Sequence, residues 1–303
     1  MAAQQFLWGA VTSAYKVEGN NVHSADLATI GAAADHWNRW PSDFGLMAQL
    51  GLTAYRFSVD WSRIESQAGQ FNQAAIEHYR EMLKELKRLN MQTFLVLQDG
   101  PWPSWFREAG GWLSPQAPQV FSKYAHYVAQ HVGDLVDGWV ILNTEAIDKQ
   151  GWLRDIVINH RMRQAQTLAA KAIRAGGPLA HIHGYDWASL DIGGVGTDDL
   201  LSFLRKKTSD RKPVYIVDSH EFTDDAAQAD FIRTRLQTIE EAQAGGINIR
   251  GYFYDSLLDG VEVAKDLPIK KGLIAVDLAT QKRSVRPFAH TYTAIIKQAT
   301  QTS

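Results

Sequence analysis

The chain has 303 residues, of which 45% are hydrophobic, and its formal charge at pH 7 is -2. A chain of this size can bury one large core, so we expect a single domain over residues 1–303. The near-neutral charge and the scattered Lys and Arg residues argue against a nucleic-acid partner, and the lack of cysteine excludes disulfides and thiolate chemistry.

Short apolar runs alternate with amphipathic stretches along the chain. The runs that predict strands are 6–11, 54–59, 93–97, 139–142, 214–217 and 251–254. The stretches that predict helices are 41–50, 74–89, 118–131, 158–175, 197–207, 226–244 and 287–298. This alternation indicates parallel strands joined by crossover helices, and about eight such units favour a closed (β/α)8 TIM barrel over an open sheet.

Residues 178–196 fit this scheme less well. The segment is long enough for two strands but shows no helix between them, whereas parallel neighbours normally need a crossover of about a dozen residues or more. Either the barrel lacks the helix between its fifth and sixth strands, or the segment holds one strand only.

Membrane and cofactor signals are missing from the sequence. No apolar run approaches the roughly 20 residues of a membrane-spanning helix, and no signal-peptide pattern opens the chain. Neither a glycine-rich phosphate loop nor a His-Glu-x-x-His motif occurs. We therefore expect a cytoplasmic protein with no cofactor and no membrane partner. Ten Trp residues suit a small-molecule ligand, a sugar or a flat aromatic molecule, although core packing is their commoner role.

Several motifs occur in a consistent order near both ends of the chain. They occupy residues 6–19, 55–58, 61–64, 251–254, 256–259 and 280–283. Together they resemble the signatures of family 1 glycoside hydrolases, the β-glucosidase-like enzymes. The resemblance implies a (β/α)8 barrel with its site at the carboxyl ends of the strands. Members of this family are usually much longer, and the missing residues fall in the middle of this chain.

The resemblance also implies where the catalytic carboxyl groups should stand. Retaining glycosidases use two of them, about 5 to 5.5 Å apart. The proton donor of the family ends the fourth strand, where strict register places Thr144 and where Glu145 follows one residue later. Because a one-residue shift turns a strand side chain to the opposite face, Glu145 reaches the pocket only if a turn or a bulge re-aims it.

The nucleophile of the family ends the seventh strand, and Asp218 stands at that position. Its side chain is one methylene shorter than that of the usual Glu, and a misplacement of about 1 Å can lower a rate on the order of 10²-fold. Asp218 is therefore either a weak nucleophile or the ion-pair partner of Arg56, whose family counterpart lies beside the nucleophile.

The sugar-binding positions implied by the resemblance are altered as well. Only Glu262 keeps the residue type that the family uses to bind hydroxyl groups. Substitutions confined to strand ends, beside intact scaffold motifs, favour a repurposed or engineered barrel over simple drift. The other positions that we expect at the pocket are Lys16, Arg56, Gln98, Asp99, Trp102 and Asp255.

Several functions remain open for such a pocket. The first is a glycosidase with weak or lost activity that uses Asp218 and Glu145. Alternatively, Asp99, Asp218 or Asp255 acts as a general base, because burial raises the pKa of a carboxyl and makes it a stronger base. Lys16 is a candidate Schiff-base amine, but the nearby carboxylates favour a salt-bridged Lys. A non-catalytic scaffold that binds a small molecule is the remaining alternative.

One pair of histidines is a candidate for a metal site. His181 and His183 alternate by two on an expected strand and so share one face, where Asp255 or His220 would complete a zinc set. Such a pair is more often packed or solvated, so no metal is expected.

Overall fold

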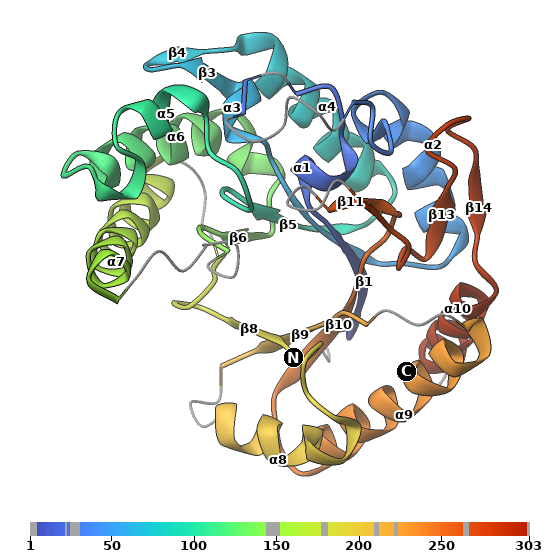
Figure 1. The fold of residues 1–303 in the computed structure, drawn as a ribbon. Helices are drawn as coiled ribbons and strands as arrows, with labels where there is room; N and C mark the ends of the chain where they lie inside the picture. The colour runs from blue at the N-terminus through green and yellow to red at the C-terminus, as the bar shows by residue number, and fades with distance from the viewer. Residues whose placement is uncertain are drawn as a thin grey trace.

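The computed structural model describes residues 5–21, 23–24, 31–143, 152–176, 181–208, 212–220, 224–262 and 267–301. Eight parallel strands curl into a barrel, which confirms the predicted fold class. Helices surround the strands on the outside (Figure 1). The barrel strands are β1 (Leu7–Thr12), β2 (Ala54–Ser58), β5 (Gln92–Val96), β6 (Gly138–Val140), β7 (His181–Ile182), β8 (Ala188–Asp191), β9 (Val214–Asp218) and β10 (Ile249–Asp255).

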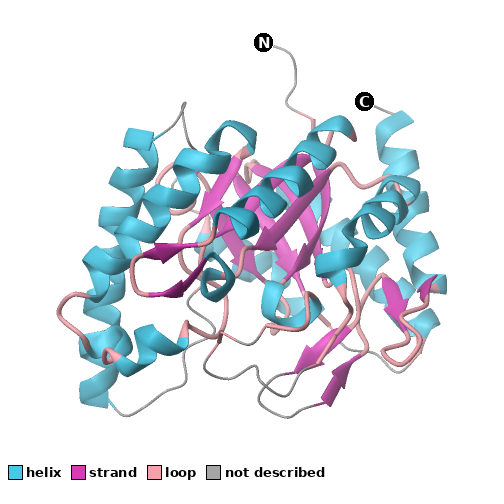
Figure 2. Cartoon of the chain, turned by 90° about the horizontal axis from the view of Figure 1, so that it is seen from above, coloured by secondary structure: helices cyan, strands magenta, loops and turns pink. Residues whose placement is uncertain are grey.

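The strands follow the order β7-β6-β5-β2-β1-β10-β9-β8 in one hydrogen-bonded sheet. The two edge strands, β7 and β8, meet through a single parallel bridge between His183 and Trp187. All carboxyl ends therefore point to the same end of the barrel. Figure 2, a view turned by 90°, shows the strands enclosed by helices and short antiparallel pairs beside one end of the barrel.

In the described part of the chain, seven long helices connect or follow the strands, as the sequence periodicity predicts. In the helix Gln73–Arg88, five apolar residues recur at helical spacing between residues 76 and 86, and all five are buried. The side chain of Asn72 caps the first turn of this helix by accepting a hydrogen bond from Ala75 N at 3.2 Å. These helices are α2 (His36–Gln49), α4 (Gln73–Arg88), α6 (Ala117–Val132), α7 (Trp152–Gly176), α8 (Thr197–Lys207), α9 (Asp225–Ala244) and α10 (Pro287–Gln301).

Shorter elements decorate the loops. Three antiparallel pairs and several short helices lie outside the main barrel units. The pairs are β3 (Glu65–Gln67) with β4 (Gln70–Phe71), β11 (Gly260–Glu262) with β12 (Leu267–Ile269), and β13 (Ile274–Val276) with β14 (Arg283–Val285). The short helices are α1 (Ala14–Val17), α3 (Trp61–Ile64) and α5 (Ser104–Glu108), with 3₁₀ turns at Gly111–Leu113 and Gly133–Leu135.

No helix separates β7 from β8, because the five residues 183–187 between them are all described and form a tight turn. Gly184 adopts a φ of +81°, which favours glycine, and its N–H donates to Trp187 O at 2.8 Å. The first of the two alternatives for residues 178–196 is therefore confirmed. The chain reaches the next strand by one loop turn instead of a crossover helix.

An aromatic layer fills the inside of the barrel. The ring centroid of Phe94 lies 5.3 Å from that of Trp187, 5.1 Å from that of Tyr215 and 5.2 Å from that of Phe253. Gly138 makes room for this layer, since a Cβ there would lie 2.5 Å from the Phe94 ring. Polar side chains are thereby confined to the ends of the inner face.

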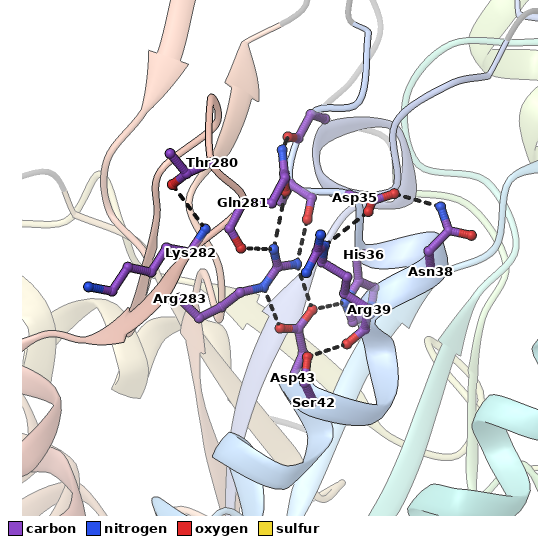
Figure 3. A network of polar contacts seen from close by, with 12 residues as sticks. Asp35, His36, Asn38, Arg39, Ser42, Asp43, Thr280, Gln281, Lys282 and Arg283 are labelled. Carbon is purple, nitrogen blue, oxygen red and sulfur yellow. Dashed lines mark hydrogen bonds and ion pairs between the residues drawn. The ribbon is translucent and has the colours of Figure 1, made fainter.

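A buried polar network joins the first helical unit to the last strands (Figure 3). Arg283 donates from Nε to Asp43 Oδ1 at 2.9 Å and from Nη2 to Asp43 Oδ2 at 3.2 Å, and His36 Nδ1 lies 2.8 Å from Asp43 Oδ2. Gln281 Nε2 donates to Ala33 O at 2.9 Å. The motif at residues 280–283 therefore ties β14 to α2.

Within the described ranges, no helix has both the length and the apolar composition that a membrane crossing requires.

Candidate functional site

A cavity of about 310 Å³ opens at the carboxyl ends of the barrel strands, where the sites of such barrels lie. Its wall carries three carboxylates and three cationic side chains, so charge on the wall is close to balanced. The charged residues are Asp99, Asp191, Asp255, Lys16, Arg56 and Lys271. The wall also includes Val11, Ser13, Tyr15, Val17, Val140, Leu142, Asn143, His183, Ser189, Val217, Ser256, Leu258, Gly260 and Ile269.

Asp99 follows β5 and is oriented by two side chains from the ends of β1 and β6. Ser13 Oγ donates to Asp99 Oδ2, and Asn143 Nδ2 donates to Asp99 Oδ1 at 3.1 Å. Burial raises the pKa of Asp99, and the Ser13 hydrogen bond and the charges of Arg56 and Lys16 act in the opposite direction. A carboxyl with a raised pKa can both take and return a proton closer to neutral pH.

Asp218 lies on the outer face of β9, contrary to the expectation that it faces the cavity. Its carboxylate accepts hydrogen bonds from Arg235 Nε and Nη2, both at 3.1 Å, and from Tyr252 OH at 2.9 Å. Arg235 comes from α9 and is fully buried. Arg235, and not Arg56, is therefore the guanidinium that holds this carboxylate.

The alternation of side chains along β9 explains this placement. Val217 belongs to the apolar cluster inside the barrel and lines the cavity. The next residue, Asp218, pairs in register with Tyr254 and turns toward the helix layer with it. The last residue of this strand thus keeps the regular period of two, with no bulge to re-aim it.

Asp255 lines the cavity at the end of β10, as expected. Its Oδ2 accepts from Lys271 Nζ at 3.0 Å, and the same ammonium donates to Ser219 Oγ at 2.7 Å. Lys271 thus bridges the ends of β9 and β10 from the segment that follows β12. The sequence carries no periodic signal for Lys271, because this residue reaches the wall from a loop.

Arg56 lines the cavity from β2, as expected, but its side chain binds Ser189 and not the expected partner Asp218. Arg56 Nη1 donates to Ser189 Oγ at 2.8 Å across the barrel. Beside it, burial and then the charge of Arg56 lower the pKa of His183 to about 4, so this ring is neutral at neutral pH. A neutral imidazole in the wall can accept or donate a hydrogen bond without adding charge.

Asp191 is a further wall carboxylate, at the end of β8, that sequence reasoning did not single out. Its Oδ1 accepts from Gly193 N at 2.8 Å. Asp191 is open to solvent on one side, but its partial burial raises the pKa of its carboxyl. The negative charges of Asp255 and Asp218 raise this pKa further, whereas the Gly193 N–H and the charge of Arg56 lower it. Asp191 lies two residues after Ser189, within the segment 178–196 that is long enough for two strands. On a strand this spacing places both side chains on one face, and it is the sequence feature that could have indicated Asp191.

Three other expected positions divide between the cavity and its surroundings. Lys16, in α1, lines the cavity, and its Nζ lies 5.4 Å from the centroid of the Tyr15 ring. Gln98 is buried outside the cavity and donates to Gly100 O at 2.6 Å. Trp102 packs with its ring centroid 6.0 Å from that of Phe106, in the loop after β5. Gln98 and Trp102 therefore support the rim but are not among the lining residues.

Some expected site residues lie outside the described part of the chain. Thr144 and Glu145, which follow β6, are outside the described residues. Glu262 belongs to β11 by its backbone, which pairs with Leu267, but its side chain is not described.

The histidine pair does not assemble a metal set. His181 is exposed at the start of β7, whereas His183 lines the cavity. Across the ranges that the structure covers, no group of three or more His, Asp or Glu residues is arranged to hold a metal ion.

Comparison with known proteins identifies relatives of the sequence. The family model of glycosyl hydrolase family 1 matches residues 2–153 and 154–301. Beta-glucosidase A of Thermotoga maritima is 29% identical over 158 residues, which cover 46% of this chain and 35% of that protein. Beta-glucosidase 6 of Oryza sativa subsp. japonica is 28% identical over 259 residues, covering 79% and 43%. The chain thus spans less than half the length of these relatives.

Solved structures share the same barrel. The beta-glucosidase from Thermotoga maritima in complex with deoxynojirimycin superposes with a TM-score of 0.88 at 19% identity, covering 98% of each chain. The beta-glycosidase from Pyrococcus horikoshii gives a TM-score of 0.87 at 20% identity, covering 98% of this chain and 95% of that one. At these identities the likeness supports the fold alone.

Proposed function

Because this chain belongs to glycosyl hydrolase family 1, we propose that its cavity binds a sugar or a sugar-like molecule and that Asp99 transfers a proton there. The wall offers hydroxyl, amide, carboxylate and ammonium groups, which suit a ligand with many hydroxyl groups. In this proposal Lys16 and Arg56 bind the ligand, because both line the cavity. Both are also close enough to Asp99 for their charges to lower its pKa.

The setting of Asp99 carries the proposal. A proton-transfer group needs a fixed orientation, access to the ligand and a pKa near the working pH. Ser13 and Asn143 orient Asp99, the cavity reaches it, and burial shifts its pKa upward, in the direction that this role requires. Asp255 is less suited to this role, because Lys271 pairs with it.

Retaining glycosidase chemistry through Asp218 and Glu145 is the competing proposal. A nucleophilic carboxylate must reach the anomeric carbon. Both oxygens of Asp218 instead accept hydrogen bonds from Arg235, and Tyr252 adds a third. This arrangement favours weak or lost glycosidase activity, and it equally favours binding without turnover.

A panel of aryl glycosides, with deoxynojirimycin as a binding probe, tests these proposals. We expect the protein to bind a member of the panel and Asp99→Asn to lower any turnover about 10²- to 10⁴-fold. Asp198→Asn, an exposed change on α8, should leave both unchanged. Turnover lost in Asp218→Asn but kept in Asp99→Asn would establish the competing chemistry. Binding without turnover would restrict the function to ligand binding, and no binding of any probe would overturn the proposal.

A further inference from the structure

The wall formed by β8, β9 and β10 presents a carboxylate one strand away from the position that the resemblance implied. Asp191 and Val217 are register partners, and both line the cavity. Neighbouring strands lie about 4.8 Å apart, so Asp191 stands directly beside the inner face of β9. Asp218, by contrast, is held on the outer face by Arg235.

The turn after β8 fixes the orientation of Asp191. Oδ1 accepts from Gly193 N at 2.8 Å, and a Cβ at Gly193 would lie 2.6 Å from Ser219 O. Arg235 binds the same turn, donating from Nη1 to Val195 O at 2.7 Å and from Nη2 to Ile192 O. The guanidinium that holds Asp218 thus also positions the loop that carries Asp191.

The three wall carboxylates differ in how far their oxygens are engaged. Two side chains bind Asp99, and the ammonium of Lys271 binds Asp255. For Asp191, within the described residues, the hydrogen bond is to a main-chain N–H, through Oδ1 alone. Oδ2 therefore remains available to a ligand, and no side-chain cation of the described wall forms an ion pair with it within 4.0 Å.

We propose that Asp191 is the ligand-binding carboxylate of this wall and that it accepts hydrogen bonds from a hydroxyl or ammonium group of the sugar-like ligand. The inference rests on the proposed function, since it assumes that the cavity takes such a ligand. It assigns Asp191 a binding role that is separate from the proton transfer at Asp99.

Calorimetric titration with deoxynojirimycin, whose ring carries an amine, and with D-glucose tests the assignment. A charge-assisted hydrogen bond is about twice as strong as a neutral one, so Asp191→Asn is expected to weaken binding of the protonated imino sugar about tenfold or more and that of D-glucose less. Asp191→Glu keeps the charge and should retain part of the preference. Asp198→Asn is the matched control, with the same change at an exposed position outside the cavity.

The outcomes separate the two proposals. Unchanged imino-sugar affinity in a folded Asp191→Asn protein would overturn the assignment of Asp191 and leave the proposed function standing. Failure of the unmodified protein to bind either probe would overturn both. Asp99→Asn provides the converse readout, because it should lower turnover strongly while retaining the preference for the imino sugar.

Discussion

Arg235 Nε and Nη2 each lie 3.1 Å from a different carboxylate oxygen of Asp218, and the two side chains are almost completely buried between β9 and α9. This bidentate pair turns the strand-end carboxylate away from the cavity. It also secures the loop after β8, because Arg235 donates to Ile192 O and Val195 O.

Replacing Arg235 with Met should destabilise the fold strongly. The change removes the guanidinium that binds both oxygens of the buried Asp218 carboxylate, which costs about 3–5 kcal/mol. Urea unfolding measures the change in the free energy of unfolding. Arg233→Met is the matched control on the same helix: its side chain is 54% exposed, so the effect should stay within about 0.5 kcal/mol. Equal effects of the two variants would contradict the structural role of the pair.

Stability should fall as the pH rises from about 4.5 to about 8 because of Glu18. Burial raises the pKa of this carboxyl from 4.5 to about 8, while Arg63, 3.0 Å away, and the Tyr79 hydroxyl act against the rise. The folded protein therefore holds a proton that the unfolded chain releases, so the contribution is full below 4.5 and is lost as the pH passes 8.

Glu18→Gln should remove this pH dependence, since the amide does not titrate. Unfolding curves at several pH values between 4 and 9 give the comparison, and the exposed Glu108→Gln protein serves as a control that keeps the slope. A slope that persists in Glu18→Gln would show that another group is responsible.

Arg283→Met should destabilise the protein by about 3 kcal/mol or more, because it removes the cation from a buried carboxylate. Burial acts to raise the pKa of Asp43, but hydrogen bonds from His36 and Arg283 outweigh it and hold the pKa below 3.8. The stabilisation from Asp43 is thus present above pH 3.8 and is lost as the pH falls through the folded pKa. Thermal unfolding of Arg283→Met and of the exposed Lys282→Met would show whether the loss is specific to this network.

The pH profile of any turnover should report Asp99. If Asp99 acts as a base, the rate rises with pH along an apparent pKa above the ordinary 3.8, in the direction that burial shifts it. Asp99→Asn should lower the rate about 10²- to 10⁴-fold, the usual contribution of acid–base catalysis. A profile unchanged by this substitution would exclude Asp99 as the titrating group.

The alternation of apolar runs and amphipathic stretches is enough to predict the barrel. Periods of two and of 3.6 residues located the strands and helices, and the bounds of α8 at residues 197–207 agree with those expected. The sequence left two alternatives open for residues 178–196, two strands without a helix between them or one strand only, and the structure has the first. Since all strands run parallel, their carboxyl ends meet on one rim, and the resemblance to family 1 glycoside hydrolases implied that Asp99 and Asp255 lie there.

Which strand-end side chains face the cavity depends on long-range contacts, and the sequence pattern does not predict it. Strands of a parallel barrel are buried on both faces, so their apolar runs do not show which face is the inner one. For this reason the sequence predicts Asp218 on the inner face, whereas it lies on the outer face. Asp191 faces inward because its register follows that of Val217, and Lys271 arrives from a distant loop. Facing depends on register and on long-range partners such as Arg235, which local sequence patterns do not encode.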